Sequence, residues 1–226
     1  MSEEPVGDAA RWQAILFDLD GTLTDSKRGI TRSIQYALRK RGLEAPDAGA
    51  LEPFIGPPLE QSFREQLGFD ASEARRAVED YREYFEQQGL YENEVYEGIP
   101  ELLRGLRASG RRVGLATSKP TVFAERILEH FDIAKHFDLI VGSFLDGRRV
   151  EKSEIVATAL AGVADVARER VVMVGDRRHD VQGARANGID AIGVTYGYGT
   201  REELRASSPT SLVASVPELR RLLLAV

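Results

Sequence analysis

Short apolar runs alternate with stretches of helical periodicity along most of this chain, and this alternation constrains the fold more than any other feature. The runs are AILF (14–17), RRVGLAT (111–117), FDLIVG (137–142), RVVMVG (170–175) and DAIGVT (190–195). Strands that alternate with helices in this way form a parallel sheet. The sequence therefore predicts an α/β fold with a Rossmann-like, parallel-sheet core.

Helical patterns fill the gaps between the apolar runs. The predicted helices cover residues 101–109, 121–130 with Thr121 as N-cap, 153–162 beginning at Ser153, and 180–187, which ends before Gly188. Serine and threonine are common N-caps, and glycine commonly follows the last helical residue. These helices are the expected crossover connections of the parallel sheet.

One region, from about Asp25 to Tyr96, breaks the alternation because its pattern is helical throughout. It contains three amphipathic stripes, around residues 30–38, 59–67 and 74–85. We expect an all-helical cap subdomain, inserted after the first strand. The predicted division is an α/β catalytic core at residues 1–24 and 97–226, with the cap at residues 25–96.

The composition limits the classes of function. The chain has 226 residues, a net charge of −6, no cysteine and three histidines without zinc-ligand spacing. The absence of cysteine excludes disulfides and thiol catalysis, and the acidic balance disfavours a nucleic-acid partner. The start, MSEEPVGDAARW, is polar, and no run of 18 apolar residues predicts a membrane span. We expect a soluble cytoplasmic protein with no membrane partner, either a monomer or a homodimer.

Polar residues follow several of the predicted strands at the point where each strand ends. In an open parallel sheet, all carboxyl ends lie on one edge, where ligands bind. The pattern therefore brings together residues that are more than 150 positions apart. These residues are Asp18, Asp20, Thr117, Ser118, Lys152 and Asp176.

This set of side chains suits phosphoryl transfer. Clustered carboxylates repel each other unless a hard cation lies among them, and Mg²⁺ takes oxygen ligands while leaving positions for a substrate phosphate. A hydroxyl group, backbone N–H groups and a lysine would neutralise the remaining phosphate oxygens. Without cysteine or a plausible serine–histidine pair, a carboxylate is the natural nucleophile, and a second carboxylate can move protons.

The motifs DLDGT (18–22), ATSK (116–119), Lys152 and GDRRHD (175–180) occur in this order along the chain. In this respect the sequence resembles the haloacid dehalogenase-like hydrolase superfamily, and within it the phosphoglycolate phosphatase-like members with a helical cap. The resemblance covers roughly residues 13–205. Many relatives have proline after the lysine, whereas this chain reads KSEI, a difference of subgroup.

The resemblance assigns the acids. It implies that Asp18 is the nucleophile and that Asp20 is the general acid and base, with its backbone carbonyl on the metal. It also implies that Asp176 binds Mg²⁺ and that Asp180 supports the metal directly or through water. Asp180 also lies where a helix N-cap is expected.

The phosphate-binding residues follow in the same way. The resemblance implies that the Thr117 hydroxyl and the Ser118 backbone hold the phosphate, and that Lys152 contacts both nucleophile and phosphate. We expect Lys119 to face solvent and His179 to be structural. The turn at Gly56, Pro57 and Pro58 is interpreted as a substrate-selecting turn or a plain linker.

The expected activity is Mg²⁺-dependent hydrolysis of a small-molecule phosphate monoester through an aspartyl-phosphate, as in phosphoglycolate phosphatases. Nucleoside 5′-monophosphates and phosphotyrosine are alternative substrates. Asp20 argues against a dehalogenase, which lacks this second acid. A regulator that binds a phosphate ligand without turnover is the alternative outside the enzymes. Asp25 is interpreted as a residue that caps the first cap helix or its hinge.

Overall fold

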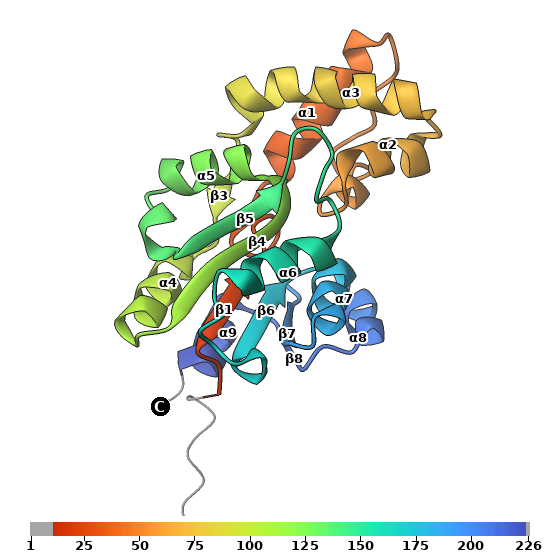
Figure 1. Ribbon diagram of the computed structural model, residues 1–226. Helices are drawn as coiled ribbons and strands as arrows, with labels where there is room; N and C mark the ends of the chain where they lie inside the picture. Colours follow the sequence, from red (N-terminus) through yellow and green to blue (C-terminus); the bar gives the residue numbers. More distant parts are fainter. Residues whose placement is uncertain (1–10, 225–226) are drawn as a thin grey trace, which may run out of the picture.

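The computed structural model describes residues 11–224. Most of the polar start of the chain, and the first ten residues of the predicted core, lie outside this range. Within it, no helix is both long and apolar enough to cross a membrane. The described residues form a parallel α/β core and a helical insertion (Figure 1).

The core sheet is built on the central strand β1 (Ala14–Phe17), which pairs in parallel with β4 and β6. Its six strands lie in the order β5-β4-β1-β6-β7-β8, and all neighbouring pairs are parallel. The remaining strands are β4 (Arg112–Pro120), β5 (Leu139–Ser143), β6 (Val171–Gly175), β7 (Asp190–Val194) and β8 (Ser211–Val213). The predicted parallel sheet is confirmed, with β8 as an additional edge strand.

Two layers of helices cover the sheet because residues of β1 alternate between its faces. Ile15 and Phe17 pack into the layer formed by α4 (Ile99–Ala108), α5 (Thr121–His130) and α9 (Val216–Leu224). Ala14 and Leu16 pack into the opposite layer, which contains α6 (Lys152–Ala161), α7 (Arg178–Ala186) and α8 (Arg201–Ser207). Short 3₁₀ turns lie at Ala134–His136 and Arg168–Arg170.

The helical insertion, residues 26–93, lies at the end of the sheet where the strands terminate (Figure 1). It contains α1 (Lys27–Lys40), a 3₁₀ turn (Glu52–Phe54), α2 (Leu59–Leu67), α3 (Ala71–Tyr84) and a π-helical turn (Phe85–Gly89). The chain enters and leaves it through β2 (Thr24–Asp25) and β3 (Glu94–Val95), which pair antiparallel. The predicted helical stripes are therefore three helices.

The starts of several helices differ from the sequence prediction. Pro120, not Thr121, is the N-cap of α5, and Glu151, not Ser153, is the N-cap of α6. Asp180 is not an N-cap, because α7 begins at Arg178 and places Asp180 in its first turn. There its carboxylate accepts a hydrogen bond from the Arg177 backbone N–H at 3.0 Å. A carboxylate in the first turn satisfies an N–H group almost as a cap does.

Candidate active site

The two central strands carry the first pair of acids to the same edge of the sheet. Asp18 follows β1 and Asp176 follows β6, and the two strands pair in register from Ala14–Val171 to Phe17–Val174. The Asp18 N–H donates to the Val174 carbonyl at 2.9 Å, which extends the pairing one step further. Sheet register thus places two residues side by side although they lie far apart in the sequence.

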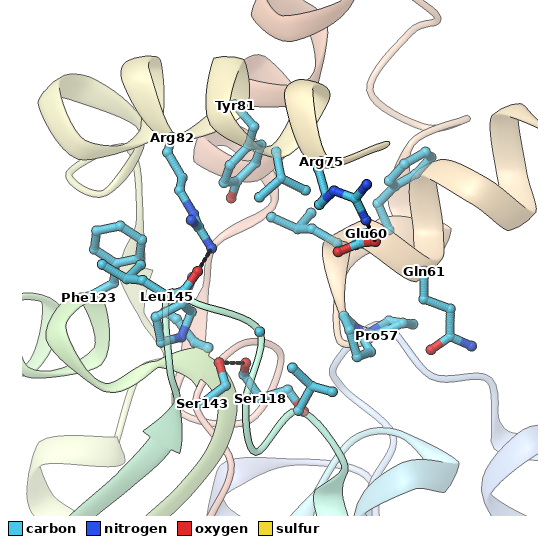
Figure 2. Close-up of a pocket in the computed structure, with 18 of the residues that line it drawn as sticks. Pro57, Glu60, Gln61, Arg75, Tyr81, Arg82, Ser118, Phe123, Ser143 and Leu145 are labelled. Carbon is cyan, nitrogen blue, oxygen red and sulfur yellow. Dashed lines mark hydrogen bonds and ion pairs between the residues drawn. The ribbon is translucent and has the colours of Figure 1, made fainter. Parts of the chain in front are cut away.

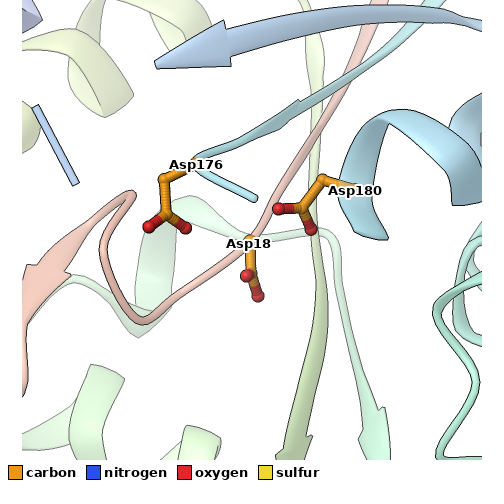
Figure 3. Close-up of side chains that lie close together, drawn as sticks. All are labelled: Asp18, Asp176 and Asp180. Carbon is orange, nitrogen blue, oxygen red and sulfur yellow. The ribbon is translucent and has the colours of Figure 1, made fainter. Parts of the chain in front are cut away.

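A third acid joins them from the first turn of α7. Asp18, Asp176 and Asp180 offer carboxylate oxygens that all lie within 4.8 Å of one another (Figure 3). Their residues are 4%, 0% and 1% exposed. Oxygen donors at this spacing suit a hard divalent cation, so these three side chains fit a Mg²⁺ ion. The Asp20 side chain is not part of this cluster.

The electrostatics of the cluster also favour the binding of a cation. Burial is the main cause that raises the pKa of Asp176 well above its ordinary value, and the charges of Asp180 and Asp18 add to it. Burial likewise raises the pKa of Asp180 to about 6, although Lys152 opposes this shift. Buried carboxylates that repel each other are costly to ionise. A bound cation would remove that cost.

Lys152 contacts two of the three clustered acids, Asp18 and Asp180. It is the first residue of α6, and its Nζ atom is 3.1 Å from Asp18 Oδ1 and 2.7 Å from Asp180 Oδ1. It also donates to the Ala116 carbonyl at 3.1 Å. Burial alone would lower the pKa of Lys152, but the two carboxylates raise it, so the ammonium stays charged. The structure therefore places a buried cation against the predicted nucleophile.

Glycine is required where the backbone closes around Asp176. Gly21 has a φ of +79°, and a Cβ atom there would lie 2.2 Å from Asp176 Oδ2. A Cβ atom on Gly199 would lie 1.9 Å from the Asp176 carbonyl oxygen. Only glycine permits this close approach of backbone to side chain. The backbone N–H of Tyr198, next to Gly199, donates to Asp176 Oδ2 at 2.7 Å.

Tyr198 also reaches the point where the chain enters the helical insertion. Its hydroxyl donates to Asp25 Oδ1 at 2.7 Å and accepts from the Lys27 N–H at 2.9 Å. Asp25 accepts from the same Lys27 N–H at 3.1 Å, one residue before the N-cap Ser26. Asp25 therefore lies at the start of the first insertion helix, where the sequence placed it. The sequence analysis did not single out the loop at 196–199, so these contacts were missed.

Thr117 and Ser118 lie near the end of β4, which runs further than predicted, to Pro120. Thr117 is buried, and its hydroxyl accepts from the Lys119 N–H at 3.3 Å. The Ser118 carbonyl accepts from the Ser143 hydroxyl at 2.8 Å. Ser118 also lines a cavity between the core and the helical insertion (Figure 2). The β4–β5 pairing is irregular between Ala116 and Pro120, which leaves this stretch less regularly paired.

The prediction that Lys119 faces solvent is wrong. Its side chain is only 5% exposed, and its Nζ atom lies 3.1 Å from Asp20 Oδ2. The ammonium also lies over the Phe85 ring, 4.5 Å from the ring centroid. Asp20 comes from the core and Phe85 from the helical insertion, so burial of Lys119 arises from packing between regions distant in sequence. No local pattern around ATSK could indicate it.

A cavity of about 910 Å³ opens between the core and the helical insertion (Figure 2). Asp20, Ser118 and Lys119 line its core side, and the turn at residues 56–58 lines its insertion side. Charged side chains of α2 and α3 line it as well, and so do six aromatic side chains, namely Phe54, Phe69, Tyr81, Phe85, Phe123 and Phe144. Of the predicted site residues, Asp20 and Ser118 therefore border the cavity together with the cap turn, whereas Thr117 and Lys152 are not part of its lining.

Arg177 connects the acid cluster to that turn. Its Nη1 donates to the Ile55 carbonyl at 2.5 Å, and its Nε donates to Glu203 at 3.0 Å. The chain at Gly56, with a φ of +107°, lies against the Arg177 side chain, since a Cβ atom there would be 3.1 Å from Arg177 Cγ. His179 lies beside this arginine, and burial lowers its pKa. The sequence reading did not single out Arg177.

Comparison with known proteins gives relatives over nearly the whole chain. A Pseudomonas aeruginosa protein named 5′-nucleotidase is 51% identical over 215 residues, which cover 95% of this chain and 97% of that protein. A Mycobacterium tuberculosis protein named tyrosine-protein kinase PtkA is 42% identical, covering 93% of this chain and 72% of that protein. Relatives at 31% identity from Yersinia are named phosphoglycolate phosphatase.

The fold gives the same grouping. The crystal structure of a protein described as a predicted phosphatase from Clostridium acetobutylicum superposes with a TM-score of 0.91, at 45% identity, covering 95% of this chain and 99% of that one. The family model described as haloacid dehalogenase-like hydrolase matches residues 15–194. That range includes all the strand-end acids and Lys152. The chain belongs to the haloacid dehalogenase-like hydrolases, and to the phosphatases of that family.

Proposed function

We propose that the chain hydrolyses nucleoside 5′-monophosphates with Mg²⁺, through an aspartyl-phosphate on Asp18. The observation that carries this proposal is the set of charged groups around Asp18. Asp176 and Asp180 lie close enough to share a cation with Asp18, and the Lys152 ammonium lies 3.1 Å from Asp18 and 2.7 Å from Asp180. The related 5′-nucleotidase supports the choice of substrate class.

In this proposal, different residues bind the metal and the phosphate. A Mg²⁺ ion held by Asp18, Asp176 and Asp180 would supply positive charge opposite the phosphate oxygens. Lys152 keeps its charge against Asp18 and neutralises the transferring phosphoryl group. The Thr117 hydroxyl and the Ser118 N–H hold the other phosphate oxygens.

Asp18 and Asp20 carry out the chemical steps. The Asp18 carboxylate attacks phosphorus while the bond to the leaving oxygen breaks, and Asp20 gives that oxygen a proton. Asp20 then takes a proton from water as the water attacks phosphorus, which releases inorganic phosphate and frees Asp18. The helical insertion acts as a cap that, together with the connections to the core at its two ends, spans residues 25–96. It limits the access of water to these steps.

The size and lining of the cavity favour a nucleoside over a smaller leaving group. A cavity of about 910 Å³ lies at the upper end of the range for drug-sized ligands. A two-carbon acid such as glycolate would leave most of it to water. The aromatic wall offers stacking surfaces for a base. Its buried cation, Lys119, is already paired with Asp20 and so is not free for a substrate carboxylate.

Steady-state kinetics test the proposal directly. We expect Mg²⁺-dependent release of phosphate with a higher kcat/KM for nucleoside 5′-monophosphates than for phosphoglycolate or phosphotyrosine. Asp18→Asn should abolish release, whereas Asp165→Asn, at an exposed acid outside the site, should not. Activity that survives Asp18→Asn would exclude the aspartyl-phosphate. Saturable binding of phosphate without turnover of any ester would instead indicate a regulator.

A further inference from the structure

The same edge of the sheet contains a second buried lysine–aspartate pair, and none of the roles assigned above involves its lysine. Lys119 and Asp20 pair at 3.1 Å, and both residues line the cavity. This pair is separate from the pair formed by Lys152, which contacts Asp18 and Asp180. A buried ion pair adds little stability by itself, because taking the two charges out of water costs about as much as their attraction returns. Its position at the reaction centre calls for another explanation.

The contacts of Asp20 are asymmetric. Its Oδ2 atom is paired with Lys119, while its Oδ1 atom is buried and has no hydrogen-bond partner among the described residues. A buried carboxylate oxygen without a partner is rare and costly unless it serves a purpose. The ion pair therefore fixes the rotation of the carboxylate and leaves one oxygen available for a proton transfer.

The helical insertion completes this arrangement. Phe85 begins the π-helical turn that follows α3, and its ring faces the Lys119 ammonium. The ring is itself held by Tyr81, at a centroid distance of 5.3 Å, and by Phe123 at 5.4 Å. Asp20 and Tyr81 line the same cavity, Asp20 from the core and Tyr81 from α3 of the insertion. π-Helical turns occur frequently at functional sites.

We propose that Lys119 is a positioning residue that orients the Asp20 carboxylate for proton transfer, and that Phe85 holds Lys119 in place when the helical insertion covers the site. This inference rests on the proposed function, because it assigns Lys119 a role through the general acid and base. The ammonium holds Asp20 Oδ2 on one side and meets the face of the aromatic ring on the other, a favourable cation–π contact. Displacement of the insertion would remove Phe85 and loosen the pair.

The test uses esters whose leaving groups differ in their need for a proton. The oxygen of an alkyl ester, such as a nucleoside 5′-monophosphate, needs a proton to leave, whereas p-nitrophenolate leaves without one. For Lys119→Met, we expect kcat/KM to fall about 100-fold for the alkyl ester and less than about threefold for p-nitrophenyl phosphate. Lys119→Arg should recover part of the loss. Lys135→Met, at an exposed lysine paired with Asp132, is the matched control and should change neither value.

A double-mutant cycle shows whether Lys119 acts through Asp20. In an Asp20→Asn background, Lys119→Met should lower kcat/KM for the alkyl ester by less than about threefold further, since the partner is already altered. Phe85→Leu should produce the same dependence on the leaving group as Lys119→Met, but smaller. Equal losses for both esters, or losses that multiply in the double variant, would mean that Lys119 contacts the phosphate itself and would overturn the proposal.

A structural measurement keeps the test independent of turnover. In a crystal structure of Lys119→Met, we expect the Asp20 carboxylate to have rotated from its present position. An Asp20 carboxylate in its wild-type orientation would contradict the proposal, whatever the catalytic activity of the variant. If the wild-type protein released no phosphate from any ester, the proposed function would fail, and this arm would still decide whether Lys119 positions Asp20. If Lys119→Met did not fold, Lys119→Arg and Phe85→Leu would carry both measurements.

Discussion

Lys152 and Lys119 are both buried beside an aspartate at the same edge of the sheet, but they depend on different regions of the molecule. Among the described residues, the Lys152 side chain contacts only the core, at Asp18, Asp180 and the Ala116 carbonyl. The Lys119 side chain contacts Asp20 in the core and Phe85 in the helical insertion. The first lysine is thus held by strands and helices of the core, whereas the second also depends on how the insertion packs.

The largest expected effect tests the core side of this comparison. Lys152→Met should lower kcat/KM by about 10²–10³-fold for alkyl and aryl esters alike, because a fixed positive charge opposite the phosphoryl group is lost whatever the leaving group. It also leaves two buried carboxylates without their cation, which should destabilise the metal-free fold by about 3–5 kcal/mol. Kinetics with both esters and denaturant unfolding measure these effects.

A loss at Lys152 that depended on the leaving group, as expected for Lys119, would erase the distinction between the two lysines. The exposed Lys135→Met variant again serves as the control.

The acid cluster should make the stability of the core depend on pH and Mg²⁺. The folded-state pKa of Asp180 is raised from 3.8 to about 6, mainly by burial. The unfolded chain therefore loses this proton first, and the carboxyl destabilises the metal-free fold increasingly as pH rises from about 4 to about 6. In EDTA, Asp180→Asn should remove part of the resulting fall in Tm between pH 4.5 and pH 7.

Mg²⁺ at a hundred times its Kd should raise the Tm at pH 7 by about 5–10 °C, a shift that a binding energy of about 2.7 kcal/mol gives for a chain of this size. Lys119→Met should leave this shift intact, because Lys119 does not contact the cluster. If Mg²⁺ did not change the Tm of the wild-type protein at pH 7, the assignment of the three acids as a metal site would be contradicted.

A smaller effect is expected where the core meets the insertion turn. Arg177→Met removes the hydrogen bond to the Ile55 carbonyl and the ion pair with Glu203. The turn at 55–58 loses its support, so we expect KM for a nucleoside monophosphate to rise about tenfold, the equivalent of one charged hydrogen bond. For p-nitrophenyl phosphate, KM should change less. Arg178→Met, at the exposed neighbour, is the control, and equal changes for both esters would place Arg177 in phosphate binding instead.

The smallest effect belongs to the outer contact between insertion and core. Arg82 in α3 donates to the Leu145 carbonyl at 2.9 Å, in the loop that follows β5 (Figure 2). Arg82→Met should weaken closure by about 0.5–1.5 kcal/mol, the usual worth of one hydrogen bond. We expect a KM increase of less than about tenfold, with faster amide exchange in residues 144–147. A change in kcat for p-nitrophenyl phosphate would show that the loop affects the chemistry.

The sequence indicated which core residues of the candidate site lie together, because Asp18 and Asp176 each follow a strand of the predicted parallel sheet. Lys152 comes instead from the first turn of α6, after the loop that follows β5. The third acid was also found, although its place within α7 was not, since local sequence does not distinguish an N-cap from a first-turn carboxylate. The strand β8 was missed because three residues are too few to show a period.

The insertion side could not be predicted in the same way. The stripes of α1, α2 and α3 were visible, but nothing in them shows which surface faces the core. Lys119 is buried because Phe85 packs over it, and the two residues lie in regions that contact only in the folded state. Arg177 and Tyr198 were overlooked for the same reason, as each one bonds to a residue more than 100 positions away.

The central position of β1 has a consequence for the order in which the chain folds during synthesis. β1 is made first, yet its two neighbours in the sheet begin at Arg112 and Val171. Until β6 leaves the ribosome, the carboxylates of DLDGT stay exposed to water and pay no desolvation free energy. The acid cluster forms only when Asp180 has also emerged. Such long-range pairing also makes folding slow, since a large loop must close first.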